Sequence, residues 1–277
     1  MAELLARGFA APDVEVLRPH IVELQDQGFT VIPDMLTDTQ LEKLRSKFEA
    51  ILAEEGLREG ERQSFERMDG VRRINDLVNK GEEFEAIWRN PILHAMVASV
   101  LTEHFRLHSL NGHDPLPGQG HQALHADWRP AMDDSKPTPA SGFGVVNSIW
   151  MLDDWKKTTG ASRLVPRSHR DPPLMDAVLK MGPPPGSSSG EKLGGAAEEY
   201  AVQVEAPAGS VCVFNGSVWH AASQNNSVDE TRRACHCAWI DRRWPQQTNQ
   251  KERLTEETAK RLSPLDRWLL DVGEKWL

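Results

Sequence analysis

One short motif, His125-Ala126-Asp127, has the residue types and the spacing to bind a metal ion. In an extended strand, residues two apart point to the same side, so the imidazole and the carboxylate would converge. A second histidine, His220, follows a strand-like run at 209–214 and a turn at Asn215-Gly216. Two histidines and one carboxylate form the facial triad of non-haem Fe(II), which leaves three coordination positions open. The short motif is common by chance, so it needs support from the rest of the chain.

The remaining histidines and cysteines have simpler interpretations. Six histidines have no partner at ligand spacing, and surface or capping roles are expected for them; they are His20, His94, His104, His108, His113 and His121. Cys235-His236-Cys237 resembles a metal motif, but strand alternation separates the histidine from both thiols and a fourth ligand is missing. With Cys212 there are three cysteines, an odd number that cannot form a disulfide framework. They are expected to pack as buried free thiols.

The elements that must position these residues change in character near residue 105. After this point, short β-rich runs alternate with Gly, Pro, Asn and Asp, at 105–110, 122–127, 143–152, 162–166, 200–204, 210–214 and 234–240. No helical pattern separates these runs, which favours an antiparallel sandwich or barrel. Residues 170–199 contain Pro183-Pro184-Pro185-Gly186 and a Ser/Gly run, and they are predicted to form a long surface loop or lid.

The first hundred residues predict mostly helix, with one strand at 28–33. Thr37 and Gln40 have the spacing of a capping box. The helix behind them would bury a stripe of apolar side chains at Leu41, Leu44, Phe48, Ile51 and Leu52. A second helical stretch is predicted over 82–103, and an amphipathic helix, interrupted by Pro264, over 254–277.

Length, composition and charge limit the class of protein. The chain has 277 residues, of which 39% are apolar and 26% charged, so a sizeable core is expected. No linker is evident, and we expect one domain over 1–277, with a mostly helical region at 1–104, a β core at 105–243 and a tail at 244–277. The formal charge of −9 argues against nucleic acid or an anionic membrane as a partner. No apolar run could span a bilayer and no signal peptide is recognised, which favours a cytoplasmic location.

A family resemblance extends across nearly the whole sequence. The segments that carry it are 27–33, 116–118, 122–128, 147–154, 160–169, 208–214, Trp219-His220, Asn225-Asn226, Arg232, 244–250 and 262–264. In this order and spacing, the chain resembles the phytanoyl-CoA dioxygenase family of Fe(II)/2-oxoglutarate oxygenases. The fold that the resemblance implies is mainly β with α: a double-stranded β-helix, a jelly-roll or cupin-like barrel, with a helical N-terminal buttress.

The resemblance also implies roles for particular residues. His125, Asp127 and His220 match the iron ligands of the family. Arg232, twelve residues after His220, matches the arginine that binds the distal carboxylate of 2-oxoglutarate. A planar guanidinium suits that task because it offers two parallel N–H donors. Arg233 is the alternative if the strand has the opposite phase, and Gln122 matches a glutamine that contacts the cosubstrate in some members.

Four further residues are candidates for substrate contacts. Trp128 and Trp150 neighbour the metal strand and the strand after it, and Asn147 begins the 147–154 motif. His236 shares a strand face with Arg232, so it is expected near the pocket without binding iron; a buried, hydrogen-bonded core histidine is the alternative.

Near the candidate site, the sequence differs from the family pattern at two positions and contains one further histidine. Arg167 replaces the usual glycine before Ser168-His169, so that turn is expected to differ. Ala222 replaces a frequent serine, which leaves a hydroxyl contact to the cosubstrate open. His169 is expected to be structural.

The reaction implied is oxidation of an unactivated C–H bond of a small organic molecule by Fe(II), 2-oxoglutarate and O2, with succinate and CO2 as co-products and ascorbate as a supporting reductant. Asp127 argues against halogenation, because related halogenases have a small residue there. Hydroxylation is the first expectation, and desaturation, ring formation and further oxidation stay open. The alternatives are an inert β-barrel binding or scaffold protein and a cupin-type hydrolase or isomerase. No acyl-CoA signature is evident, and neither substrate nor oligomeric state can be read from the sequence.

Overall fold

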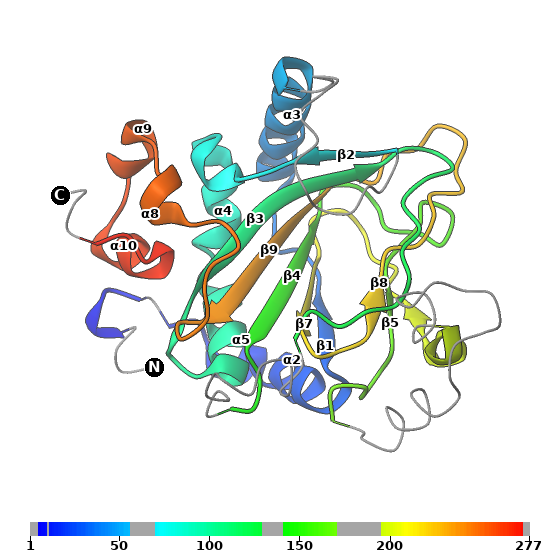
Figure 1. Cartoon of the computed structure of the whole chain (residues 1–277), viewed down its shortest axis with the longest axis horizontal. Helices are drawn as coiled ribbons and strands as arrows, with labels where there is room; N and C mark the ends of the chain where they lie inside the picture. The colour runs from blue at the N-terminus through cyan, green and yellow to red at the C-terminus, as the bar shows by residue number, and fades with distance from the viewer. Residues whose placement is uncertain (1–4, 10, 56–69, 129–140, 171–194, 274–277) are drawn as a thin grey trace.

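The computed structural model describes residues 5–9, 11–55, 70–128, 141–170 and 195–273. Its centre is a six-stranded sheet in the order β1-β7-β4-β9-β3-β2, in which every neighbouring pair is antiparallel (Figure 1). The strands are β1 (Phe29–Ile32), β2 (Val71–Ile74), β3 (Phe105–Pro115), β4 (Val145–Met151), β7 (Val211–Asn215) and β9 (Ala234–Asp241). The predicted strand at 28–33 is confirmed as β1, whereas β2 was not predicted.

A smaller sheet lies beside one face of the large sheet (Figure 1). Its order is β6-β5-β8, and its strands are β5 (Arg163–Leu164), β6 (Val202–Gln203) and β8 (His220–Ala221). The predicted strand at 122–127 is not regular; instead His125 forms an isolated antiparallel bridge with His220. The two-sheet β architecture is therefore confirmed, although within the described residues no ladder closes the sheets into a barrel.

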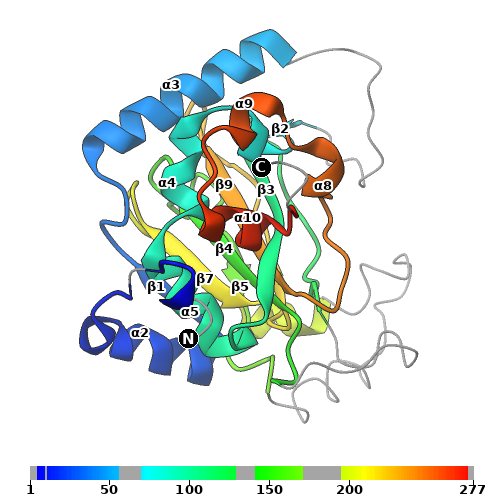
Figure 2. The same ribbon diagram turned by 90° about the vertical axis from the view of Figure 1, so that its left-hand side faces the viewer.

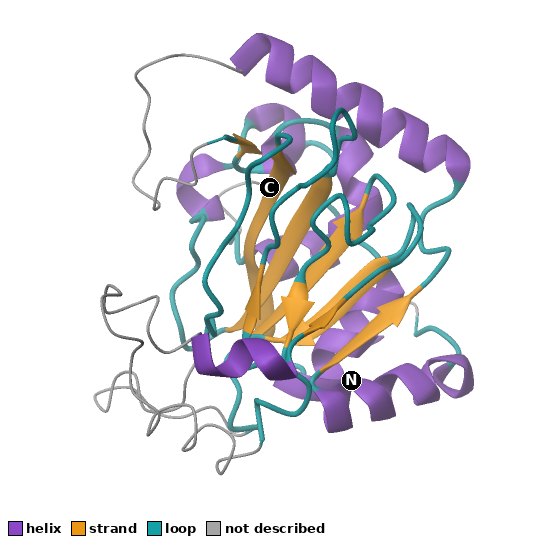
Figure 3. Ribbon diagram, turned by 90° about the vertical axis from the view of Figure 1, so that its right-hand side faces the viewer, coloured by secondary structure: helices purple, strands orange, loops and turns teal. Residues whose placement is uncertain are grey.

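The α-helices cover the opposite face of the large sheet, and they stand in front of it in Figure 2 and behind it in Figure 3. The α-helices are α2 (Val14–Gln27), α3 (Asp38–Glu55), α4 (Glu85–Trp88), α5 (Pro91–Leu101), α8 (Gln250–Arg253), α9 (Glu256–Ala259) and α10 (Pro264–Leu270). The 3-10 helices are η1 (Leu77–Asn79), η2 (Glu82–Phe84) and η3 (Gly195–Tyr200). The tail is thus not one helix, because Pro264 begins α10 where the sequence predicted only an interruption.

Local sequence explains where the long helices begin. Before α3, Thr37 N donates to Gln40 Oε1 at 2.9 Å and Gln40 N donates to Thr37 Oγ1 at 3.3 Å, which is the predicted capping box. The predicted stripe of α3 is buried along its full length. At α5, Asn90 Oδ1 accepts from two backbone amides and Pro91 occupies the first turn, so both signals fix this start.

Strand alternation divides the core between the two faces of the large sheet. On β9, Cys235 and Cys237 pack against the helices, whereas Ala234 belongs to the cluster on the other face. Trp150 of β4 is also on the helix side, where it is fully buried and its Nε1 donates to Ser148 Oγ at 3.1 Å. This position does not support the predicted contact of Trp150 with substrate, because the strand turns its side chain away from the small sheet.

The helix-side cluster contains residues from the N-terminal region, the β core and the tail. The single domain over 1–277 stays a prediction. The predicted lid at 170–199 lies outside the described residues over 171–194, and its end forms η3. Among the described helices, none has the length and apolar character to cross a membrane.

Candidate metal centre

A cavity of 550 Å³ lies between the large sheet and β8, and it brings most of the predicted site residues together. Seven of them line it: Gln122, His125, Asp127, Asn147, His220, Arg232 and His236. Apolar wall is supplied by Val145, Ile149 and Phe214. The predicted substrate residues Trp128 and Trp150 are not among the described lining residues.

The three predicted metal ligands converge at one end of this cavity. Within the described part of the chain, His125, Asp127 and His220 form the group whose donor atoms all lie within 4.8 Å of one another. His125 Nε2 is 3.7 Å from Asp127 Oδ1, and His220 Nε2 is 3.5 Å from Asp127 Oδ2. Reciprocal backbone hydrogen bonds, 3.0 and 2.8 Å long, join His125 to His220 and hold the two rings side by side.

Hydrogen bonds orient both imidazole rings for coordination through Nε2. His125 Nδ1 donates to Ala123 O at 3.0 Å, and His220 Nδ1 donates to Val218 O at 2.9 Å. A carbonyl oxygen can only accept, so each neutral ring carries its proton on Nδ1 and a lone pair on Nε2. Metal-binding histidines commonly have this arrangement, because the outer hydrogen bond fixes both the tautomer and the ring plane.

Asp127 is held from both its backbone and its side chain. Its amide donates to Gly216 O at 2.8 Å, and Asn147 Nδ2 donates to Asp127 Oδ2 at 2.8 Å. Burial disfavours the charged carboxylate, but His220, His125 and the Asn147 amide outweigh it, so the pKa of Asp127 lies well below its usual value. Asn147 lines the cavity and donates to the candidate ligand Asp127, so it would orient this carboxylate; its predicted contact with substrate stays a prediction.

The donor set fits a divalent transition metal. Two neutral imidazoles and one ionised carboxylate supply mixed N and O donors, and the side chains of His125 and Asp127 are 43% and 40% exposed toward the opening. These exposed ligands leave room for further molecules at the metal. A structural zinc site would instead be closed by a fourth protein ligand.

Arg232 places a buried cation in the same cavity. The residue is only 4% exposed, and no described carboxylate forms an ion pair with its guanidinium, whose Nε has no hydrogen-bond partner. The guanidinium lies 5.0 Å from the ring of Trp155, and burial lowers its pKa to about 10 although Asp114 opposes the shift. Burying an unpaired charge is costly, so this site calls for an anionic ligand.

Arg233 points the opposite way, as the phase predicted for this strand requires. Its guanidinium donates to Asp153 Oδ1 at 2.7 Å and to Glu49 Oε1 at 3.1 Å. Since acids of the chain already neutralise Arg233, Arg232 is the arginine available to a ligand.

Gln122 and His169 have specific structural contacts. Gln122 Oε1 accepts from Ala222 N at 3.1 Å, and its backbone oxygen accepts from Arg163, so this side chain holds the loop before His125 against β8. His169 Nε2 donates to Gln25 O at 3.2 Å, which joins its turn to α2. Arg167 has the left-handed φ of 67° that favours glycine, so the turn tolerates a side chain there.

Three cavity residues were missed by the sequence analysis. His108, His113 and Arg73 line the cavity, contrary to the surface or capping roles expected for both histidines. The ring of His113 stacks on that of His236 at 4.1 Å between centroids, and burial lowers the pKa of both imidazoles. Alternation along 105–115 places Asn111 and His113 on one face, and this was the available signal.

Trp128 supports the site from outside the cavity. It is 6% exposed and packs edge-on against Trp244, with 4.5 Å between ring centroids. It also packs over Gly144, where a Cβ atom would lie 2.6 Å from its ring. The predicted substrate contact of Trp128 is not supported, because this packing turns the indole to the outer side of the cavity wall.

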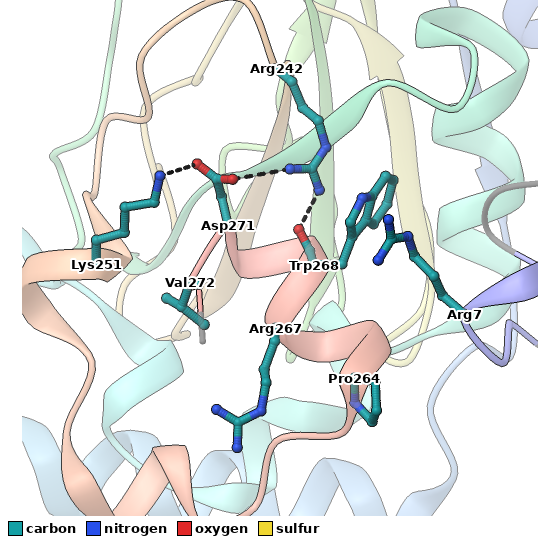
Figure 4. A pocket seen from close by; sticks show the side chains of 9 residues that line it. Arg7, Arg242, Lys251, Pro264, Arg267, Trp268, Asp271 and Val272 are labelled. Atoms are coloured by element: carbon teal, nitrogen blue, oxygen red, sulfur yellow. Dashed lines mark hydrogen bonds and ion pairs between the residues drawn. The ribbon is translucent and has the colours of Figure 1, made fainter. Parts of the chain in front are cut away.

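A second pocket, of 440 Å³, lies near the C-terminal helix α10 and is separate from the triad (Figure 4). Arg242 donates to Asp271 Oδ1 at 3.2 Å and lies 3.8 Å from the Trp268 ring, whose surroundings also include Arg7. The arginine side chains of this second pocket pack α10 against neighbouring segments. None of the candidate metal ligands lies among the described residues that line it.

Known proteins resemble this chain over most of its length. The model of the phytanoyl-CoA dioxygenase (PhyH) family matches residues 24–234. The chain is 26% identical to "Dioxygenase af480" of Aspergillus fumigatus over 90% of this chain and 75% of the relative. It is 27% identical to the "Fe(II)/2-oxoglutarate-dependent dioxygenase nvfF" of Aspergillus novofumigatus over 75% of this chain and 66% of the relative.

A solved structure supports the fold. The non-haem alpha-ketoglutarate-dependent carbocyclase SnoK from nogalamycin biosynthesis superposes with a TM-score of 0.62 at 19% identity. The superposition covers 84% of this chain and 87% of SnoK. The double-stranded β-helix fold predicted from the sequence is confirmed at this level.

Proposed function

The chain belongs to the phytanoyl-CoA dioxygenase family, and from this membership we propose that it oxidises a C–H bond of a small organic molecule with Fe(II), 2-oxoglutarate and O2. The observation that carries the proposal is one cavity that contains both a two-histidine, one-carboxylate cluster and a buried arginine for which the described residues provide no ion-pair partner. Such a cavity provides for a metal and for a dianionic cosubstrate at once.

His125, Asp127 and His220 would hold the iron, and Arg232 would bind the distal carboxylate of 2-oxoglutarate. With iron held by these residues, O2 would be the oxidant. The oxidative decarboxylation of 2-oxoglutarate to succinate and CO2 would supply two of its four electrons, and the C–H bond of the substrate would supply the other two. In the neutral rings the chain directs the Nδ1 proton to a backbone carbonyl and leaves the lone pair on Nε2, it favours the ionised Asp127 carboxylate, and it places Arg232 in the cavity lining. Because Arg232 is buried, its hydrogen bonds to a carboxylate would be stronger than in water.

Hydroxylation is the outcome we propose first. Asp127 occupies the carboxylate position, which argues against halogenation. Ring formation stays open, since the structurally similar SnoK is described as a carbocyclase. The proposal includes a cytoplasmic location, because the three cysteines are free buried thiols, as is usual in a reducing compartment. Ascorbate is proposed as a supporting reductant in assays.

The proposal is tested by adding Fe(II) and 2-oxoglutarate to the purified protein without O2 and recording the charge-transfer absorption band of the complex. We expect the band with wild type and its loss in His220→Ala. A substrate screen by mass spectrometry, with succinate as the second readout, then follows under O2. Absence of both the band and succinate would favour the alternative, an inert binding or scaffold protein of the same fold.

A further inference from the structure

Arg73 is a second arginine of the cavity, and the proposed reaction leaves it without a task. It lies on β2, where its register partner is His113 of β3, and its side chain lines the same cavity as the triad. Although Arg73 is an exposed residue, partial desolvation of its guanidinium lowers its pKa below the usual value.

The neighbouring arginine shows what Arg73 lacks. Arg72 points to the other face of β2, where its Nε donates to Asp114 Oδ2 at 3.0 Å and its Nη1 lies 3.4 Å from Glu49 Oε2. Among the described residues, no carboxylate forms an ion pair or hydrogen bond with Arg73. The two adjacent guanidinium groups thus differ: acids of the chain neutralise Arg72, whereas Arg73 lines the cavity and has no acidic partner in the described part of the chain.

The charges of the cavity wall do not balance. Its described lining contains two guanidinium groups, from Arg73 and Arg232, and one carboxylate, from Asp127. The carboxylate of Asp127 would bind the metal, and the guanidinium of Arg232 would form an ion pair with 2-oxoglutarate. The rest of the wall is apolar or neutral and polar, including Asn75, Asn111 and Gln246. An excess of positive charge on this wall, in a chain of net charge −9, favours the binding of an anion there.

The two arginines of the cavity differ in exposure. Arg232 is 4% exposed, whereas Arg73 is an exposed residue of the same lining. A cosubstrate bound at Arg232 and the metal would leave Arg73 for the molecule that enters after it.

We infer that Arg73 binds an oxyanion group of the substrate, so that the substrate is a carboxylate or a phosphate ester with an apolar body. This inference rests on the proposed function and adds its substrate class. The guanidinium fork would bind the oxyanion through two hydrogen bonds, and Val145, Ile149 and Phe214 would contact the apolar part.

The test measures equilibrium binding of three probes to the enzyme loaded with Fe(II) and 2-oxoglutarate under anaerobic conditions, by titration calorimetry. The probes are benzoate, its neutral isostere benzamide, and phenyl phosphate. We expect the better of the two anions to bind wild type at least about tenfold more tightly than benzamide, and Arg73→Gln to lose about ten- to a hundredfold of that affinity. Arg73→Lys should lose less, because the charge remains without the fork.

Two controls keep the outcomes distinct. Arg18→Gln removes one positive charge from an exposed site on α2 and should leave anion affinity unchanged. The Fe(II)·2-oxoglutarate absorption band should persist in Arg73→Gln, with unchanged affinity for 2-oxoglutarate.

The inference is overturned if neither anion binds wild type more tightly than benzamide, if Arg73→Gln keeps full anion affinity, or if it weakens 2-oxoglutarate instead. Failure of the wild-type band would contradict the proposed function itself. Preference for benzoate assigns a carboxylate substrate, and preference for phenyl phosphate assigns a phosphate ester.

Discussion

Both ligand histidines use the same local geometry, in which Nδ1 donates to the carbonyl two residues earlier in the chain. The acceptors are Ala123 O for His125 and Val218 O for His220. Because the acceptor belongs to the same short segment, each ring is oriented before any metal arrives. His125 lies outside the regular strands and His220 lies on the two-residue strand β8, yet these hydrogen bonds fix the direction of both rings.

Replacing any one ligand should remove the metal site. In His125→Ala, Asp127→Ala or His220→Ala, Fe(II)-dependent formation of succinate should fall by more than about a hundredfold, beyond the loss typical of an outer hydrogen-bond partner. The core clusters contain none of these side chains, so the thermal midpoint without metal should change little. Full activity of His220→Ala would contradict the assignment.

Asn147→Ala should weaken metal binding without abolishing it. The amide of Asn147 is the described side chain that donates to Asp127 Oδ2, and without it the carboxylate rotates more freely. Metal affinity should fall about ten- to a hundredfold, as for other groups that orient a ligand. Competition with a metal chelator measures this loss. If Asn147 contacted only substrate, as the sequence suggested, metal affinity would be unchanged.

Arg232→Lys should raise the concentration of 2-oxoglutarate required for turnover by about ten- to a hundredfold, because the bidentate fork is lost while the charge remains. Arg233→Lys is the matched control, since Arg233 pairs with Asp153 and Glu49 on the helix side. The KM for 2-oxoglutarate and the Kd from the absorption band both report the effect. The reverse pattern would mean that the strand phase assigned to these two residues is wrong.

At the scale of elements, β9 separates the site from the core. Its alternate residues Cys235 and Cys237 pack beneath the helices, and His236 between them lines the cavity. The helix α5 continues this packing through His94, whose ring meets Trp239 of β9 edge-on at 5.1 Å. His94 Nε2 donates to Trp88 O at 2.8 Å, which joins α5 to the end of α4.

The buried position of His94 predicts a pH-dependent loss of stability. Burial lowers the pKa of His94 from 6.5 to about 4, although the Trp88 carbonyl opposes the shift, so the folded protein keeps this ring neutral. As the pH falls below 6.5, His94 becomes protonated in the unfolded chain but stays neutral in the folded protein. The free energy of unfolding should therefore decrease as the pH falls from 6.5 to about 4 and stay level below pH 4. The loss due to His94 should total about 3 kcal/mol.

Urea unfolding of wild type and His94→Leu across this range isolates that contribution, because the other buried histidines titrate in both proteins. As the pH falls, the free energy of unfolding of wild type should decrease more than that of His94→Leu. A difference that stays constant with pH would mean that His94 is protonated in the folded state.

At the scale of the whole molecule, the metal centre joins segments that the chain supplies far apart. His125 lies on the segment after β3, and His220 forms part of the small sheet, while Arg232 precedes β9 in the large sheet. The cavity is therefore closed by long-range pairing rather than by any one element, and its ligands connect the two sheets.

Binding of metal and cosubstrate should stabilise the fold as a whole. At a hundredfold excess over Kd, a ligand specific for the folded state contributes about 2.7 kcal/mol. We expect Fe(II) with 2-oxoglutarate, without O2, to raise the thermal midpoint by several degrees, and 2-oxoglutarate alone to raise it less. Asp127→Ala provides the control, because it should lose the metal-dependent part of the shift. An equal shift in that variant would place the metal elsewhere.

The residues and elements that depend on near neighbours were predictable. The pairing of His125 with Asp127, the opposite directions of Arg232 and Arg233, and the capping box before α3 all follow from the two-residue period of a strand or the hydrogen bonds of one helical turn. The ordered motifs then identified the family, and the family resemblance supplied the role proposed for His220.

Which faces are covered was decided only by tertiary structure. Trp150 and His236 both occupy strands near the site, yet one packs beneath helices and the other lines the cavity. Likewise, the pairing of β2 with β3 places Arg73 opposite His113, although the local sequence of neither segment predicts this pairing. The physical reason is that alternation gives each strand two possible faces, whereas the choice of the buried face and of the neighbouring strand depends on contacts between segments distant in sequence.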